Sequence, residues 1–98
     1  MYSLEEIKSI LYPIFIANAV YQAILFGSYA KGIATDTSDV DIVIDSKGEL
    51  LNINFYGLLE EIKEKLNKNV DLFEISEIQK NSSIYETIQK EGVILYAR

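Results

Sequence analysis

The expected fold of this chain depends on the stretch LFGSYAKGIATDTSDVDIVID, residues 25–45. It leaves an apolar run, breaks at Gly27-Ser28, crosses a polar turn and enters a second apolar run that carries Asp39 and Asp41. Side chains two positions apart on a strand project from the same face. The two carboxylates should therefore lie side by side, and like charges tolerate this poorly unless a cation sits between them. The pattern predicts a divalent-metal site on a strand.

Helix and strand patterns flank this stretch. Ser3 and Glu6 form a capping box that predicts the start of a first helix, and Pro13 inside that helix predicts a kink or a restart. In chain order, the patterns then predict a strand at 20–26, a brief helix at 28–32, a strand ending near Asp45, a long helix within 50–69, a strand at 70–75, short helices at 76–80 and 82–91, and a strand at 93–96. Ile84 and Ile88 should face inward. Together these elements indicate a sheet with helical cover.

The length and composition predict one domain, residues 1–98. Hydrophobic residues make up 49% of the 98 positions, which is ample for a single core. No apolar run approaches the roughly 18 residues that span a bilayer. The N-terminal MYSLEEIKSI carries two acids and lacks the basic start of a signal peptide. We therefore expect a cytoplasmic protein without a membrane partner.

Two residue types are missing, and their absence narrows the chemistry. Without cysteine the chain has no disulfide or thiolate site, and without histidine it lacks the usual general base. Any metal site must use oxygen ligands, which favour magnesium or manganese over zinc or copper. The net charge of -6 would repel a phosphate backbone. We therefore expect no direct nucleic-acid partner and favour a basic protein partner.

Gly27, Ser28 and Lys31 occupy the turn between the first strand and the brief helix. Free backbone amides at a helix start attract phosphate, and a glycine lets a bulky anion approach the backbone. Lys31 can add a point charge. The alternative is an ordinary strand-to-helix turn with Ser28 as a simple cap. The spacing to the aspartate pair favours the phosphate site.

Asp71 lies near the start of the strand at 70–75, in a run that is otherwise apolar. An unpaired buried carboxylate is costly, so Asp71 should either lie at the open edge of the sheet or have a cationic partner. From the residues alone it could equally cap the turn after Asn69. Glu74 should point to the other face and be structural.

Gly27-Ser28, ten intervening residues and Asp39-Val40-Asp41 together resemble the signature of the polymerase-beta-like nucleotidyltransferase superfamily. The GSYAKG wording at 27–32 and the short chain are similar to its minimal (MNT) branch, whose members are commonly antitoxins of HEPN-type toxins. The leading helix, the strand with Asp71 and the ending IYETIQKEGVILYAR at 84–98 extend the resemblance over nearly the whole chain. It implies an α/β (α+β) nucleotidyltransferase fold, with a small mixed sheet of about four strands flanked by helices.

The resemblance also implies roles for the site residues. The catalytic and metal-binding carboxylates, which would hold Mg²⁺ or Mn²⁺, are Asp39, Asp41 and Asp71. The residues that would bind the triphosphate of ATP or another nucleotide are Gly27 and Ser28, with Lys31 adding charge.

The implied reaction transfers a nucleotide monophosphate, AMP from ATP, to a hydroxyl of a HEPN-type toxin, most plausibly a tyrosine. The chain would then be an enzyme that acts as an antitoxin. It has no length for the extra helical domain of larger members, so a homo-oligomer or the partner would complete the site. One alternative is a non-catalytic antitoxin that neutralises its toxin by occlusion, and a weaker one is a small-molecule nucleotidyltransferase. The presence of all three carboxylates favours the enzyme.

Overall fold

The first helix of the computed structural model, which describes residues 1–98, is α1 (Leu4–Ala17). It begins with the predicted capping box: Glu6 N–H donates to Ser3 Oγ at 3.1 Å, and Ser3 N–H donates to Glu6 Oε1 at 2.8 Å. The predicted restart at Pro13 is wrong, because α1 is continuous through that residue. Pro13 is exposed, so water can satisfy the carbonyl that loses its helical partner.

The elements that follow confirm the predicted order of helices and strands. They are β1 (Gln22–Phe26), α2 (Ser28–Lys31), β2 (Val40–Asp45), α3 (Ile53–Leu66), β3 (Val70–Glu74), the 3₁₀ turn η1 (Ile75–Glu77), α4 (Ser83–Glu91) and β4 (Val93–Ala97). The helix predicted at 76–80 is reduced to this single 3₁₀ turn. Asp39 lies immediately before β2 rather than on it.

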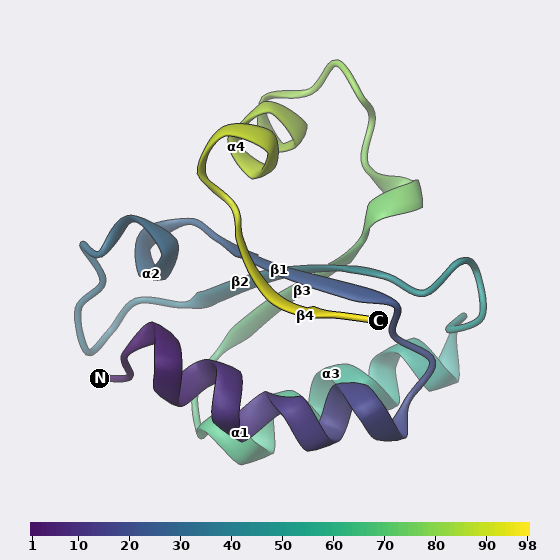
Figure 1. Ribbon diagram of the computed structural model, residues 1–98, viewed down its shortest axis with the longest axis horizontal. Helices are drawn as coiled ribbons and strands as arrows, with labels where there is room; N and C mark the ends of the chain where they lie inside the picture. The colour runs from purple at the N-terminus through teal and green to yellow at the C-terminus, as the bar shows by residue number, and fades with distance from the viewer.

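The four strands form one mixed sheet in the order β3-β2-β1-β4 (Figure 1). β1 is antiparallel to both β2 and β4, whereas β2 and β3 are parallel. A parallel pair needs a crossover connection, and α3 supplies it. The small mixed sheet of about four strands predicted from the sequence is confirmed.

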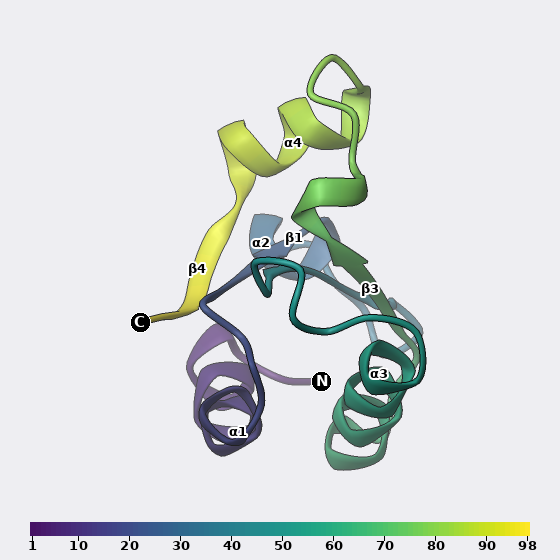
Figure 2. The same cartoon turned by 90° about the vertical axis from the view of Figure 1, so that its right-hand side faces the viewer.

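Helices cover both faces of the sheet (Figures 1 and 2). α1 and α3 lie side by side on one face, over the larger core, and α4 lies on the other. Val40, Ile42 and Ile44 point into the larger core, opposite to Asp41, as the alternation predicts. Burial of such aliphatic side chains contributes about 1.5–3 kcal/mol each. The charged face of β2 is therefore held in place by the packing of its apolar face.

α4 covers only a small second cluster. Ser82 caps the helix as predicted, with Tyr85 N–H donating to Ser82 Oγ at 3.2 Å. Ile88 is buried against Phe26 and Val43. The inward orientation expected for Ile84 is wrong: Ile84 is 40% exposed, and Ile88 is the α4 residue that is buried in the small cluster.

A few buried polar contacts join segments that are far apart in the chain. Glu74 is buried and accepts hydrogen bonds from the Ser46 N–H, at 3.2 Å, and from the Ser46 hydroxyl. Its predicted structural role is confirmed. Tyr2 Oη donates to Leu66 O at 2.7 Å and joins the start of α1 to the end of α3. None of the helices has both the length and the apolar character needed to cross a bilayer.

Candidate active site

Parallel pairing of β2 and β3 places Asp41 opposite Asp71. The two residues are 30 positions apart in the numbering, yet side chains at paired positions on one face are direct neighbours. Asp71 is exposed, and β3 is an edge strand. Of the two environments considered for Asp71, the open edge of the sheet is therefore confirmed.

Asp41 is the most perturbed carboxyl of this cluster. Partial burial, a side-chain hydrogen bond with Asp71, and repulsion from Asp71 and Asp39 together raise the pKa of Asp41 to about 6. Burial is the largest cause. A bound cation would stabilise the ionised form of Asp41, because its positive charge offsets both the cost of burial and the repulsion from the other carboxylates.

Gly27 lies directly against the Asp41 carboxylate. Its backbone has φ 77° and ψ -153°, a conformation that side chains with a Cβ rarely adopt. A Cβ built on Gly27 would overlap Asp41 Oδ2 and lie 3.2 Å from Asp41 Cγ. The antiparallel register explains the proximity, because the preceding residue, Phe26, pairs with Asp41. Packing therefore brings the glycine turn of the sequence motif into contact with Asp41, one of its two aspartates.

Ser28 is the first residue of α2, and Gly27 occupies the cap position without any side-chain hydrogen bond. The alternative in which Ser28 is a simple cap is therefore wrong, and its hydroxyl is not used to begin this four-residue helix. Lys31 lies at the end of α2, where its Nζ is 3.3 Å from Glu91 Oε2 at the end of α4. The lysine is about half exposed and is already paired within the chain.

The three predicted metal-binding carboxylates are not gathered into a ready-made site. No group of three acidic side chains lies close enough together to hold a metal ion. Asp41 and Asp71 are neighbours, and Asp39 is a nearby third charge at the start of β2. Three carboxylates repel one another in the absence of a cation, so their full convergence is unfavourable in the free protein. The donor set itself, oxygen atoms only, fits a hard divalent ion.

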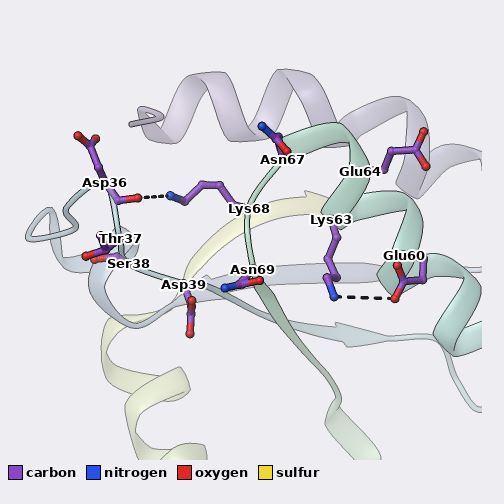
Figure 3. A pocket seen from close by; sticks show the side chains of 10 residues that line it. All are labelled: Asp36, Thr37, Ser38, Asp39, Glu60, Lys63, Glu64, Asn67, Lys68 and Asn69. Atoms are coloured by element: carbon purple, nitrogen blue, oxygen red, sulfur yellow. Dashed lines mark hydrogen bonds and ion pairs between the residues drawn. The ribbon is translucent and has the colours of Figure 1, made fainter.

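A polar hollow of about 710 Å³ adjoins Asp39 (Figure 3). Its lining residues are all polar and come from the 36–39 turn, α3 and the residues after it: Asp36, Thr37, Ser38, Asp39, Glu60, Lys63, Glu64, Asn67, Lys68 and Asn69. Lys68 Nζ donates to Asp36 O at 2.9 Å. The sequence analysis missed this hollow, because no local pattern shows that the 36–39 turn lies beside α3. Figure 3 shows Asp39 with its carboxylate pointing away from Lys68.

A family model, described as polymerase beta, nucleotidyltransferase, matches residues 5–98. The chain belongs to this nucleotidyltransferase family. The protein adenylyltransferase MntA of Thermococcus cleftensis is 35% identical to this nucleotidyltransferase over 97 residues, which are 95% of this chain and 96% of that relative. Members of the family generally use divalent metal ions. The predicted family and enzyme class are confirmed.

Solved structures share the fold. A toxin-antitoxin complex with AMP-PNP contains a chain that superposes with a TM-score of 0.80 and 22% identity, covering 93% of this chain and 73% of that one. A tri-AMPylated Shewanella oneidensis HEPN toxin in complex with an MNT antitoxin gives a TM-score of 0.74 and 18% identity, covering 97% and 73%. The nucleotidyltransferase fold predicted from the motif is confirmed.

Proposed function

We propose that this nucleotidyltransferase is an antitoxin that transfers AMP from ATP to a tyrosine hydroxyl on a HEPN-type toxin. The observation that carries the proposal is the contact of Gly27 with Asp41, which in turn faces Asp71. This contact supports a shared site in which the turn binds phosphate beside a pair of carboxylates. The MntA relative is a protein adenylyltransferase, and the Shewanella oneidensis complex pairs an MNT antitoxin with an AMPylated toxin. A reaction that uses ATP is consistent with a cytoplasmic location.

The nucleotide is held from the β1–α2 turn. The absence of a Cβ at Gly27 leaves the backbone open beside Asp41, so phosphate oxygens can approach the amides there. The Ser28 hydroxyl adds a donor to the same turn. Lys31 supplies a positive charge once its ammonium turns from Glu91 toward the phosphates. These three residues position the triphosphate, whether of ATP or of another nucleotide.

The carboxylates would hold the metal ion that the family uses. Asp39 and Asp41, with Asp71 beside them, present oxygen donors that suit Mg²⁺ or Mn²⁺. Such an ion, when bound, neutralises the charge that builds up on the reacting phosphates. Asp41 must be ionised to ligate, which its raised pKa opposes in the free protein.

Asp71 is the group that can take the proton of the acceptor hydroxyl. The chain contains no histidine, and Asp71 is the exposed member of the carboxylate pair. The acceptor oxygen forms a bond to the α-phosphorus, and the bond from that phosphorus to the bridging oxygen breaks. Pyrophosphate leaves, and the hydroxyl proton moves to a carboxylate oxygen of Asp71. The product is an AMP ester of the toxin.

The proposal is tested with ATP labelled at the α-phosphate, Mg²⁺ and the purified cognate toxin. We expect label to move to the toxin and to be lost in Asp39→Asn and Asp41→Asn. Asp45→Asn is the matched control, because Asp45 lies on the same strand but accepts a hydrogen bond from Lys47 N–H at 2.9 Å in the exit turn.

Transfer by the Asp41→Asn variant at the normal rate would contradict the assigned role. Normal neutralisation of the toxin by both inactive variants, without label transfer, would show that the chain acts by occlusion. Sedimentation of the chain with and without the toxin shows whether a homo-oligomer or the partner completes the site.

A further inference from the structure

We infer that an apolar groove at the outer edge of β3 is the surface on which the partner toxin docks, through an apolar segment that carries a basic side chain. We name it the β3 groove, and its defining residues are Leu51, Tyr56, Leu72, Phe73, Glu74 and Glu77. The inference rests on the proposed function, since it says which surface receives the protein that is modified.

Six of the nine residues that line the β3 groove are hydrophobic, and two of them are largely exposed. The groove encloses about 340 Å³ between the loop before α3, the first turns of α3 and the strand β3. Leu51 is 57% exposed and Tyr56 65% exposed. Exposed apolar side chains gathered beside a groove are typical of protein interaction sites, and aromatic residues are enriched at the centres of such interfaces.

The charge of the groove selects the partner. Two acidic side chains, Glu74 and Glu77, line the groove, and no basic side chain lines it. Glu74 is buried and is bonded only through Ser46, without an ion pair, although a carboxylate has about four acceptor positions. An arginine or lysine of the partner could therefore pair with these glutamates while the apolar side chains around it pack against the hydrophobic residues of the groove. A second copy of this acidic chain would be repelled by the same charges.

The position of the groove links docking to catalysis. β3 has a strand on one side only, and Figure 2 shows it at the edge of the sheet next to α3. Asp71 and Glu74 lie three residues apart on β3, which is about 10 Å along a strand. Their side chains lie on opposite faces of the strand, so a protein bound in the groove reaches Asp71 around the open edge of β3. Another exposed apolar pair, Tyr12 and Ile16, lies on α1, where Tyr12 packs against Tyr96 of β4 at the opposite edge of the sheet.

The test measures the affinity of the full chain for its purified cognate toxin by isothermal titration calorimetry. We expect Leu51→Asp and Tyr56→Asp each to weaken binding by about tenfold or more, because each introduces a charge into the apolar contact. Glu77→Lys should weaken binding by about the same factor through repulsion of the basic side chain. Ile16→Asp is the control: it places the same charge at a side chain that is 49% exposed near the other edge.

The outcomes separate this inference from the proposed function. Binding by Leu51→Asp and Tyr56→Asp that matches the wild type, while the wild type still labels the toxin, overturns the docking site alone. Failure of the wild type to label the toxin overturns the proposed function. If the Leu51→Asp and Tyr56→Asp variants bind the toxin weakly but transfer label normally at saturating toxin, their catalytic residues are intact. That result supports the groove as the docking site. A chain that is dimeric alone and becomes monomeric in Tyr56→Asp identifies a second copy as the occupant and overturns the inference.

Discussion

Gly27 combines two constraints that no other residue type satisfies. Its φ of 77° disfavours a side chain, and the Asp41 carboxylate occupies the place of a Cβ. We expect Gly27→Ala to lower the free energy of unfolding by about 3 kcal/mol and to abolish ATP binding, because the Asp41 side chain must move. Urea unfolding and ATP titration measure the two effects.

Gly48→Ala is the matched control for this substitution. Gly48 has a φ of 78°, but a Cβ there would meet nothing within 4 Å. Gly48→Ala should lower the free energy of unfolding by about 1 kcal/mol, the cost of the positive φ without any steric overlap, and should leave ATP binding unchanged. Equal losses of stability in the two variants would show that the contact with Asp41 contributes nothing.

The raised pKa of Asp41 predicts that the metal-free protein gains stability as the pH falls. The carboxyl has a pKa of about 6 in the folded protein and 3.8 in the reference state, so its protonated form is favoured by folding. This contribution is fully present below pH 4 and is lost as the pH rises through 6. Because Asp41 is partly exposed, we expect this contribution to the free energy of unfolding to be only about 1 kcal/mol.

Asp41→Asn removes the charge and tests this pH dependence. In EDTA at pH 7.5 the variant should be more stable than the wild type by about 1 kcal/mol, and the gap should narrow by pH 4.5. Urea denaturation at both pH values measures it. A gap that is constant with pH would contradict the assignment of the shift to Asp41.

At the level of elements, α2 and α4 are tied by the ion pair of Lys31 with Glu91. Glu91→Gln frees Lys31 for the phosphates and should strengthen ATP binding by about threefold, as expected for a partly exposed charge contact of about 0.6 kcal/mol. ATP titration in the presence of Mg²⁺ measures it. Lys31→Met should weaken binding instead, and unchanged affinity in both variants would exclude Lys31 from the nucleotide site.

α3 contains a glycine that its environment does not require. Gly57 lies inside the helix, is exposed, and a Cβ there would meet nothing within 4 Å. Gly57→Ala should therefore raise the free energy of unfolding by about 0.5–1 kcal/mol, since alanine loses less backbone entropy on folding. Thermal unfolding measures the gain. A loss of stability would indicate that the backbone at this position is strained.

For the whole molecule, ligand binding and folding stability are linked. ATP with Mg²⁺ at a hundredfold excess over its dissociation constant should stabilise the wild type by about 2.7 kcal/mol, because only the folded chain assembles the site. Asp41→Asn should show little of this gain, and Asp45→Asn should retain it. Differential scanning fluorimetry across an ATP series gives the comparison. Equal stabilisation of all three proteins would place the nucleotide elsewhere.

Most of the architecture and the family could be read from the amino-acid sequence, and the candidate site residues could be proposed from it. The capping box at Ser3, the alternation around Asp41 and the spacing from Gly27 to Asp39 led to the correct elements, fold and family. These signals are local: a cap or a strand face depends on neighbours within about four positions. Such patterns depend little on the tertiary structure, so they can be recognised from the sequence alone.

The contacts that make the site depend on packing instead. The pairing of Asp41 with Asp71 follows from a parallel register reached through α3, and the contact of Gly27 with Asp41 follows from the antiparallel register of β1 and β2. The ion pair of Lys31 with Glu91 joins segments 60 positions apart in the numbering. No local pattern encodes such distances, because the register and the burial of one segment are set by all the segments that pack against it.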